Sequence, residues 1–420
     1  MMIEILTIEE FNDYALKHEL SYFSQSSYWG NLKHMNGWIP HYVGLKKDSV
    51  IVGATLLLAK KIPVFPKYFF YAPRGFLVDY HDQKLLDEFV GGIRDYVRKN
   101  SGIFVKINPM ILYQERDVDG NIVEDGECNQ DIVDHLIKLG FQHNGFPLDY
   151  GVDLEPRWIS VLDLRGKSAD QLLKEMRPTT RSVINNSYKY GLELVELKRE
   201  ELHIYKKMME ETGERRGFID RPLSYYEKMY DEFSPSNSIK FMVVRLNLEN
   251  YVSTLKSRID EMNHKIDMEE KKERPREGTL REWNDQVKSI QSNLEYTQSL
   301  FDQYGSEVIV AGGVFMTFGR QVVSLFGASY KEFMKYNGQY FLNYEMIKYA
   351  IDHGFDTYNF LGITGHFEPD HEMYGLFNFK RGFGAIVTEL IGEFTLVVKP
   401  FYYWVYKRML SVYIFLKRFH

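Results

Sequence analysis

The chain has 420 residues, of which 44% are hydrophobic and 26% are charged, so it can bury a full core and has room for two or three domains. Its net charge of −6 argues against a surface built throughout for nucleic acid, because phosphate neutralisation dominates such binding. The single cysteine, Cys128, excludes internal disulfides and cysteine-based zinc clusters. The acidic first residues lack the basic and apolar regions of a secretory leader, so we expect a cytoplasmic protein.

The first third of the chain has the pattern of an α/β unit. Residues 41–62 alternate apolar and polar positions around a turn at 46–48, which predicts a β-hairpin. A strand and loop follow at 68–80. Residues 83–102 then have apolar positions at helical spacing, and 103–109 are typical of a strand. The predicted order is hairpin, helix, strand.

Residues 246–305 interrupt this pattern with two amphipathic helices. Their apolar residues step by three and four, as in the seam between two packed helices. These residues are Val252, Leu255, Ile259, Met262 and Ile266, then Leu280, Trp283, Val287, Ile290, Leu294, Thr297, Phe301 and Tyr304. Between the two runs, Pro275 cannot lie in a helix interior and Gly278 tolerates a left-handed turn. We therefore predict an antiparallel coiled-coil hairpin with arms of roughly 36 Å at 1.5 Å per residue.

The hairpin, helix and strand recur after this insertion, at 308–330, 339–354 and 355–362. The order resembles the N-acyltransferase fold of the acetyl-CoA-dependent superfamily, in which a splayed sheet admits the acyl donor. The loop that cradles the pyrophosphate of acetyl-CoA needs a small last residue. The nearest string, RGFGAI, has Arg381 but places Ile386 at that position. Coenzyme A is therefore disfavoured as the donor, although a coenzyme-A-dependent N-acyltransferase stays an alternative.

The C-terminal segment, 399–420, has five Lys or Arg and no acid. On a helical wheel the cations fall on one half and the apolar residues on the other. The apolar residues are Phe401, Val405, Met409, Val412, Leu416 and Phe419. The segment carries too many charges for a membrane span. We predict an amphipathic helix that either packs on its own protein or also contacts the anionic inner face of the membrane.

Eight strings spread along the chain carry a more specific resemblance. They include FSQSSYWGNLKHMNGW, TGERRGFIDRPLSYY, YAIDHGFDTYNFLGITGHF and LFNFKRGFGAIVTELIGEF. In that order they make the sequence similar to the FemABX family of peptidoglycan bridge peptidyltransferases over essentially its whole length. The resemblance implies transfer of Gly, Ala or Ser from aminoacyl-tRNA to an amine of the stem peptide or its growing cross-bridge. It implies no cofactor, and the acceptor would be lipid II or UDP-MurNAc-pentapeptide. Related Fem-type transferases are candidate partners.

The resemblance also implies an α/β fold of two acetyltransferase-like subdomains with an inserted helical arm. We place the first subdomain at 1–153 and the second at 154–245 plus 306–398. The coiled-coil arm takes 246–305, and the basic terminal helix takes 399–420.

Lys380 is the candidate catalytic residue, because the family places a lysine after an aromatic residue at this point. Aminolysis of an ester passes through a tetrahedral oxyanion, and a fixed cation beside it contributes on the order of 3 kcal/mol. Phe379 could stack on a base or sugar of the tRNA acceptor end. From the residue type alone, an exposed lysine would be the ordinary interpretation.

Lys33, Arg221 and Tyr225 match the family's precursor channel. Arginine's planar fork suits phosphate oxygens, which the pyrophosphate of the precursor supplies. Tyr330 falls at a family site position where many members have serine. Arg74 lies in a glycine-containing turn, where it either contacts the substrate or braces the loop.

The group that accepts the proton is left open. Where many relatives have Asp-Pro, this chain has Asn108-Pro109, so that position supplies no carboxylate base. Glu393 is the remaining carboxylate near the predicted site, although a glutamate beside a sheet is more often an ion-pair partner. Proton transfer through the terminal ribose hydroxyl of the tRNA is an equal alternative.

One loop could imitate a metal site, because it contains His366, Glu368, Asp370, His371 and Glu372. It has neither helical histidine spacing nor a cysteine. We therefore predict a solvated loop and no metal.

A function of another class also stays open. The helical arm and the basic terminus could belong to a non-catalytic scaffold that holds wall-synthesis proteins at the membrane.

Overall fold

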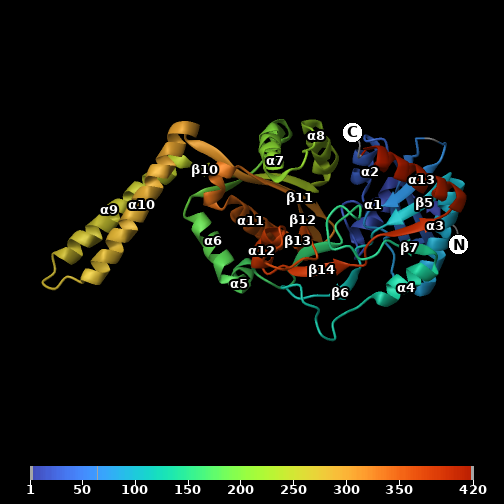
Figure 1. Ribbon diagram of the computed structural model, residues 1–420, viewed down its shortest axis with the longest axis horizontal. Helices are drawn as coiled ribbons and strands as arrows, with labels where there is room; N and C mark the ends of the chain where they lie inside the picture. Colours follow the sequence, from blue (N-terminus) through green and yellow to red (C-terminus); the bar gives the residue numbers. More distant parts are fainter. Residues whose placement is uncertain (1–2, 64, 418–420) are drawn as a thin grey trace.

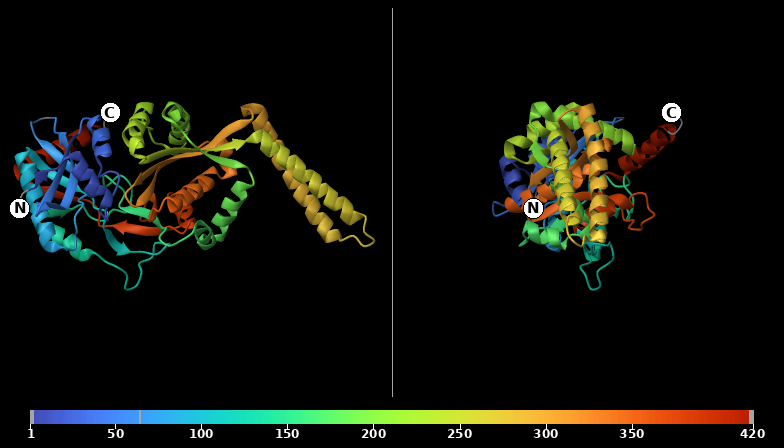
Figure 2. Two further views of the ribbon diagram at one scale, coloured as in Figure 1. Left: turned by 180° about the vertical axis from the view of Figure 1, so that it is seen from behind. Right: turned by 90° about the vertical axis from the view of Figure 1, so that its left-hand side faces the viewer.

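The computed structural model describes residues 3–63 and 65–417, the last six of these by their backbone alone. Figure 1 shows an elongated molecule with two lobes, each built around a β-sheet, and a helical arm that projects from the second lobe away from both chain ends. The two arm helices also lie side by side in both views of Figure 2. The predicted α/β fold of two subdomains is confirmed.

The first lobe holds a seven-stranded sheet in the order β1-β2-β3-β4-β5-β15-β7. The strands are β1 (Glu4–Ile5), β2 (Ile39–Lys47), β3 (Val50–Lys61), β4 (Tyr68–Ala72), β5 (Gly102–Ile107), β15 (Phe394–Val397) and β7 (Phe141–His143). The helices are α1 (Ile8–Lys17), α2 (Ser27–His34), α3 (Gln83–Lys99) and α4 (Gln130–Lys138). Helix α3 buries its apolar stripe against the sheet, as its helical spacing predicts.

The second lobe holds an eight-stranded sheet in the order β6-β14-β8-β13-β12-β11-β10-β9. The strands are β6 (Leu112–Glu115), β14 (Ile386–Leu390), β8 (Trp158–Asp163), β13 (Thr357–Ile363), β12 (Gln321–Ser329), β11 (Glu307–Phe318), β10 (Ile239–Asn247) and β9 (Leu192–Glu196). Helices α7 (Leu202–Arg216) and α8 (Leu223–Phe233) cover one face (Figure 1). The other face carries α5 (Ala169–Glu175), α6 (Pro178–Tyr188), α11 (Gly338–Asp352) and α12 (Tyr374–Gly382). Three short 3-10 turns complete the lobe: η1 (Arg199–Glu201), η2 (Ser234–Ser236) and η3 (Lys331–Tyr336).

One unit of four strands and a helix is used in both lobes. In the first lobe, β2, β3 and β4 are antiparallel neighbours, and α3 leads to β5, which pairs parallel with β4. In the second lobe, β10, β11 and β12 take the same places, and α11 leads to β13, which pairs parallel with β12. The predicted hairpin at 308–330 therefore corresponds to β3 and β4, not to the hairpin at 41–62. The inserted arm separates β10 from β11 and hides this correspondence in the sequence.

Two short strands cross the predicted subdomain boundaries. Strand β6 comes from the first predicted subdomain but pairs with β14 in the second sheet. Strand β15 comes from the second but lies between β5 and β7 in the first sheet. The boundaries at 153 and 398 are corrected accordingly, because the lobes exchange a strand. One core cluster also joins them, with Phe11 and Leu56 from the first lobe packed together with Tyr205 and Phe241 from the second.

The arm is an insertion at the turn of the β10–β11 hairpin. Leu246 pairs with Val308 and Asn247 with Glu307, after which α9 (Leu248–Glu270) and α10 (Glu277–Tyr304) continue as two antiparallel helices. The predicted seam is buried or half-buried except at Tyr304, which is exposed and packs beside Phe333 of η3.

The tip of the arm differs from the prediction at Gly278. That glycine is the second residue of α10 and has no left-handed backbone. The turn is held instead by Glu269, whose carboxylate accepts hydrogen bonds from the Lys272 side chain at 2.5 Å and from the Arg276 side chain at 3.1 Å. These bonds lower the pKa of Glu269 to about 2. Two ion pairs to one carboxylate thus hold the turn of the hairpin, in place of the backbone freedom predicted at Gly278.

The C-terminal helix α13 (Pro400–Lys417) packs on the first sheet, so the prediction of a helix is confirmed. Its packing face is only partly the predicted one. Tyr403 and Tyr406 pack against Phe104, with ring centroids 5.2 and 5.3 Å apart, whereas Phe401 is 70% exposed. The side chains of Val412, Leu416 and Phe419 lie outside the described residues. Among the residues described, no helix is long and apolar enough to cross a membrane.

Candidate active site

The side chain of Lys380 is buried at the C-terminal end of α12. It is 6% exposed, and its Nζ donates to the main-chain carbonyls of Leu361 at 3.2 Å and Gly362 at 2.6 Å. Burial lowers the pKa of Lys380 to about 7, because the charged form loses its hydration. Near neutral pH the amine is therefore divided between its charged and neutral forms. The exposed lysine that the residue type suggests is excluded.

Lys380 contacts an irregular point of β13. Leu361 has a φ of 64°, a left-handed conformation that is uncommon for a non-glycine residue and concentrates at functional sites. The Asn359 side chain steadies it by accepting the Leu361 N–H at 2.8 Å. Parallel pairing of β12 with β13 covers only residues 321–323 and 357–359, and beyond them the strands no longer pair. This is the splayed opening that the repeated fold predicts for an acyl donor.

Phe379 belongs to an aromatic cluster beside Lys380. Its ring centroid lies 4.8 Å from that of Tyr340 on α11 and 5.3 Å from that of Phe383. The cluster fixes α12 against α11 and so fixes the direction of the Lys380 side chain. Stacking of Phe379 on a nucleotide stays a prediction.

The structure brings Lys33, Arg221 and Tyr225 together, although they come from α2 and the start of α8. The Arg221 guanidinium lies 5.2 Å from the Tyr225 ring and 4.7 Å from the ring of Phe326 on β12. Burial lowers the pKa of Lys33, with the positive charge of Arg221 adding to the shift and the negative charge of Glu155 opposing it. These side chains therefore form one electrostatic group, which can bind an anion.

Glu155 is a residue of this group that the sequence does not reveal. It lies in the linker between the lobes, residues 144–157. Its side chain is 27% exposed, and its carboxylate is 3.9 Å from the guanidinium of Arg74. A single carboxylate in an irregular segment follows no periodic pattern. None of the strings that resemble the family includes Glu155, so nothing in the sequence singles this residue out.

Arg74 braces the linker between the lobes. It is 1% exposed, and its Nη2 donates to the carbonyl of Pro156 at 2.9 Å. The main chain of Arg74 is held in turn by Asn108, whose side-chain oxygen accepts the Arg74 N–H at 2.9 Å. Of the two roles predicted for Arg74, the geometry favours bracing, because its guanidinium is enclosed.

The linker also connects the two predicted groups of site residues. Pro156 and Tyr150 lie so close to Gly362 that a side chain there would meet them at 2.9 and 2.8 Å. The carbonyl of Gly362 accepts from Lys380, and the charge of Glu155 acts on Lys33. The buried lysine and the cation group are therefore both connected to one short segment, the first through Gly362 and the second through Glu155.

Tyr330 packs against the same hydrophobic cluster as Tyr225. It follows β12 and packs beside Phe333, with ring centroids 6.3 Å apart. Burial raises the pKa of Tyr330 to about 12, with Glu211 and Glu332 as the nearest charges. In the part of the chain that the structure describes, no hydrogen bond joins Tyr330 to Lys380, Lys33 or Arg221.

Glu393 sits at the junction of the lobes and is 1% exposed. Its carboxylate pairs with Lys106 of β5, accepts from the Asn144 side chain at 2.6 Å and accepts from the Leu154 N–H at 3.1 Å. Both oxygens are thus engaged in holding the linker against the first sheet. This is the ion-pair role that a glutamate beside a sheet commonly has, and an acid or base role stays a prediction.

A second acid lies beside this junction. Both side-chain oxygens of Asp153 are buried without a hydrogen-bond partner in the described chain. Burial raises the pKa of Asp153 to about 6, and the charge of Glu393 adds to the shift. Arg157 and Lys106 oppose it. Protonation of Asp153 at a pH of about 6 would therefore remove one negative charge from the junction.

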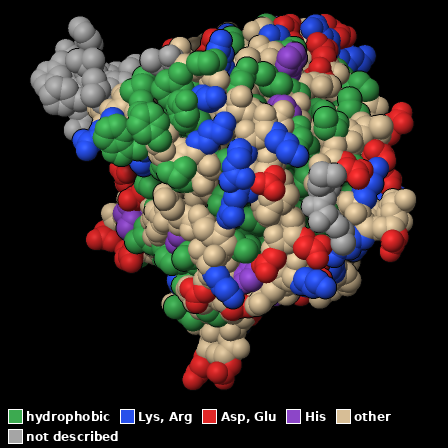
Figure 3. Space-filling model, turned by 90° about the vertical axis from the view of Figure 1, so that its right-hand side faces the viewer, with side chains coloured by type: hydrophobic (Ala, Val, Ile, Leu, Met, Phe, Trp, Pro, Cys, Tyr) green, Lys and Arg blue, Asp and Glu red, His purple; other side chains and the backbone are tan. Residues whose placement is uncertain are grey.

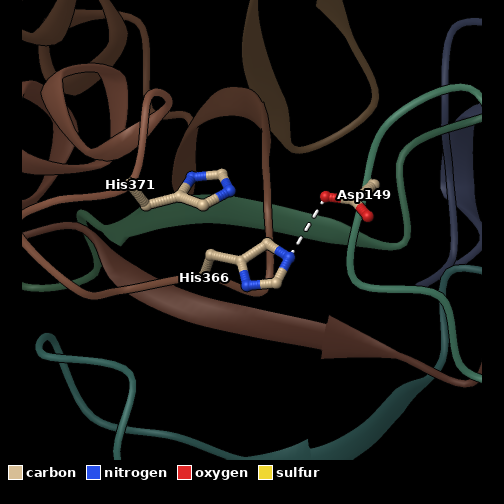
Figure 4. A group of neighbouring side chains, drawn as sticks. All are labelled: Asp149, His366 and His371. Atoms are coloured by element: carbon tan, nitrogen blue, oxygen red, sulfur yellow. Dashed lines mark hydrogen bonds and ion pairs between the residues drawn. The ribbon is translucent and has the colours of Figure 1, made fainter.

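The loop that contains His366 and His371 lies beside a third candidate metal ligand, which the sequence did not indicate. Figure 4 shows His366 and His371 beside Asp149, which comes from the linker between the lobes. Their ligand atoms lie within 4.8 Å of one another, so the three could hold a divalent cation. His366 already contacts the Asp149 carboxylate at 3.1 Å, and the two imidazole rings stack at 4.3 Å. A hydrogen bond and a stacked pair explain the arrangement without a metal.

The nearest match to a coenzyme A loop is engaged in other contacts. Arg381, its first residue, pairs with Asp119 at 2.9 Å. Gly384, two residues beyond the end of α12, has a left-handed φ of 82°, which only leads the chain into β14. The string RGFGAI therefore terminates a helix.

Comparison with known proteins agrees with this geometry. A sequence model of the FemAB family matches residues 6–410. The aminoacyltransferase FemA of Staphylococcus aureus is 30% identical over 403 residues, which cover 94% of each chain. FemA of Staphylococcus epidermidis is 30% identical over 421 residues, which cover 98% of each chain. A crystal structure of FemX has a TM-score of 0.77 and 26% identity, over 96% of this chain and 99% of that one. The family resemblance of the sequence is confirmed.

Proposed function

We propose, on the premise that the chain belongs to the FemAB family, that it is an aminoacyltransferase that builds the peptidoglycan cross-bridge. It moves an amino acid from aminoacyl-tRNA to an amine of a peptidoglycan precursor and uses no other cofactor. The observation that carries the proposal is the buried Lys380 amine at the splayed end of β13. The linker between the lobes connects that amine to the cation group of Lys33 and Arg221, because Pro156 packs on Gly362 and the charge of Glu155 acts on Lys33.

The reaction needs an amine, an ester and a group that stabilises negative charge. The acceptor amine attacks the ester carbonyl, a C–N bond forms, and the C–O bond to the ribose breaks. A protonated lysine has three hydrogens, of which Lys380 gives two to Leu361 and Gly362. The third is available to the tetrahedral oxyanion. The proton of the attacking amine passes to the ribose oxygen that leaves, with the neighbouring ribose hydroxyl as the carrier.

The cation group is suited to the acceptor. Both lipid II and UDP-MurNAc-pentapeptide carry a pyrophosphate, and Arg221 with Lys33 offers two cations to its oxygens. Tyr225 holds the guanidinium from one side, which keeps the fork in place.

The decisive experiment incubates the enzyme with radiolabelled glycyl-, alanyl- or seryl-tRNA and each of the two precursors, with and without ribonuclease. We expect label on one precursor from one of the three tRNAs, and none after ribonuclease. Transfer that survives ribonuclease, or no transfer from any charged tRNA, would overturn the proposal. Calorimetric titration with acetyl-CoA tests the alternative donor, and we expect no heat of binding.

We further propose that the acceptor is lipid-linked and that the α13 face rests on the membrane that contains it. Figure 3 shows apolar side chains near the C-terminus and Lys and Arg side chains spread over the same face. Phe401 is 70% and Trp404 58% exposed. Burial lowers the pKa of Lys399, and the neighbouring positive charges of Lys67 and Arg98 add to the shift. Exposed aromatic rings beside clustered cations suit an anionic bilayer.

Sedimentation with vesicles tests this contact. We expect binding to phosphatidylglycerol vesicles but not to phosphatidylcholine vesicles, and loss of binding in the double variant Phe401→Ser, Trp404→Ser. Ile219→Ser is the control, because Ile219 is 98% exposed on the second lobe. Equal binding by the double variant would remove α13 from the contact. Association with related Fem-type transferases stays a prediction, which co-purification from cells would test.

A further inference from the structure

A cleft of about 540 Å³ opens at the base of the arm. Its walls come from the end of α6, the residues that follow it, both arm helices and η3. Helix α6 and the two arm helices lie on the side of the second lobe that faces away from the first lobe (Figure 1). None of the predicted site residues lines the cleft.

The cleft is cationic although the arm as a whole is not. Residues 246–305 contain nine Lys or Arg and twelve Asp or Glu. The cleft is lined by Lys189, Arg258 and Lys335 and by no acid. Lys189 donates to a neutral amide at 2.9 Å, and the Lys335 ammonium lies 3.9 Å from the Tyr296 ring. Three cations that face one hollow without a carboxylate attract a polyanion.

The remaining walls supply hydrogen-bonding groups. The Tyr251 hydroxyl accepts from the Asn293 Nδ2 at 2.8 Å. The Asn293 Oδ1 is buried and has no partner within the described residues. Ser289 and Ser292 add two hydroxyls. Contacts of this kind, from Lys, Arg, Ser, Asn and Tyr side chains, are those that proteins make to phosphates and sugars of nucleic acid.

Helix α6 links the cleft to the catalytic lysine. At the start of α6, the Arg177 N–H donates to the carbonyl of Gly382 at 3.1 Å, and Thr180 packs directly on Gly382. Gly382 ends α12, two residues after Lys380. At the other end of α6, Asn186 and Lys189 enter the cleft. The helix has 11 residues, so the cleft lies roughly 16 Å from α12 along its axis.

We propose that this cleft binds the phosphodiester backbone of the tRNA donor, behind the aminoacylated end that reaches Lys380. The inference rests on the proposed function, and it assigns a binding surface for the donor that is separate from the precursor group at Lys33 and Arg221. It also explains why the arm has a neutral or acidic surface elsewhere. The arm contributes two walls of the cleft, and the RNA contacts its base only.

The test compares two triple variants of the full chain. The cleft variant is Lys189→Gln, Arg258→Gln, Lys335→Gln. The control variant is Lys256→Gln, Lys265→Gln, Lys288→Gln, which removes the same charge from arm positions outside the cleft. Binding of uncharged tRNA is measured by fluorescence anisotropy at several salt concentrations. Transfer is measured with full-length aminoacyl-tRNA and with an aminoacylated dinucleotide.

We expect the cleft variant to bind tRNA at least tenfold more weakly and to lose about two units of the slope of log K against log salt. Its KM should rise for aminoacyl-tRNA but change less than twofold for the dinucleotide, and the control variant should resemble the parent. Equal losses in both triples, or equal losses with both donors, would overturn the inference. Binding of inorganic phosphate in the cleft with unchanged tRNA affinity would also overturn it, because the site would then take a free anion.

The tRNA binding measurement separates this inference from the proposed function. A parent enzyme that transfers nothing from any charged tRNA would refute the function. Loss of tRNA affinity in the cleft variant alone would still establish the RNA site.

Discussion

The Nζ of Lys380 lies 2.6 Å from the carbonyl oxygen of Gly362, and Pro156 of the interlobe linker packs against the Cα of the same glycine. One backbone position thus holds the Lys380 amine and supports the segment that carries Glu155. A shift of the linker would displace Gly362 and, through its carbonyl, the Lys380 amine.

Replacing Lys380 with Met should lower kcat about 10²- to 10³-fold, the usual effect of removing one donor to an oxyanion. The Kd for the precursor should change less than threefold, because the Lys380 amine bonds to β13 carbonyls and not to the cation group. Single-turnover transfer and precursor titration measure the two quantities. A fully active Lys380→Met protein with a native circular dichroism spectrum would remove Lys380 from the mechanism.

The pKa of Lys380 predicts the shape of the pH profile. Above a pKa of about 7 the side chain loses the proton that the oxyanion needs, while the acceptor amine becomes more reactive as it loses its own. The two effects oppose each other, so log kcat/KM should level off above pH 7. Lys380→Arg keeps its charge at every pH, and its slower transfer should continue to rise about tenfold per pH unit. Identical profile shapes for the two proteins would contradict this assignment.

Stability provides an independent check on the same group. The unfolded chain binds the Lys380 proton up to the ordinary pKa of 10.5, whereas the folded chain releases it near 7. Between these values the unfolded state binds more protons, so the contribution of Lys380 to folding stability increases with pH. We expect the free energy of unfolding of the parent, relative to Lys380→Met, to rise from pH 7 to pH 10 in urea titrations. A constant difference would mean that the buried amine has an ordinary pKa.

Arg221 should matter for acceptor binding and little for chemistry. Arg221→Ala removes one cation of the group that includes Lys33, so the KM for the precursor should rise 10- to 100-fold while kcat stays within threefold. Arg216→Ala is the matched control, since Arg216 is an exposed arginine on the preceding helix. If both substitutions raised the KM for the tRNA donor by similar factors, the cause would be a general loss of positive charge.

The sequence predicts those parts of the fold and site that have a recognisable local pattern of residues. The arm follows from its periodic apolar residues, and Lys380, Arg221 and Tyr225 follow from strings that resemble a family. The pairing of β15 between β5 and β7 does not, because Phe394 finds its partner Ile107 far away in the chain. A strand of four residues is too short for its sequence pattern to predict which strand it pairs with.

The sequence also does not determine which residues are buried. A helical wheel separates the faces of α13 but cannot say which one packs, and Tyr403 and Tyr406 pack where Phe401 was expected. The same holds for Glu155 and Asp149, which acquire neighbours only when the linker folds between the lobes. Single polar residues in irregular segments have no periodicity to read.

Glu393 should prove to be a structural tether. Glu393→Gln removes the charge that pairs with Lys106 and, because Lys106 is partly exposed, should cost about 2 kcal/mol of stability. A double-mutant cycle with Lys106→Met measures the coupling. At a temperature where both proteins are folded, kcat should stay within about threefold of the parent. A loss of 100-fold or more without loss of precursor binding would assign Glu393 the role of a base.

The outer part of the arm should be dispensable. Tyr251, Leu255 and Leu300 belong to the core of the second lobe, and the cleft ends at Arg258 and Ser289. Replacing residues 262–284 with a short Gly-Ser turn therefore leaves both the core and the cleft, and the turn joins two helices that are already antiparallel neighbours. We expect transfer from full-length aminoacyl-tRNA within twofold of the parent and a Tm within a few degrees. Loss of transfer in a folded truncated protein would mean that the tip contacts the donor. Unchanged transfer together with a cell-wall defect in vivo would instead indicate that the tip binds a partner protein.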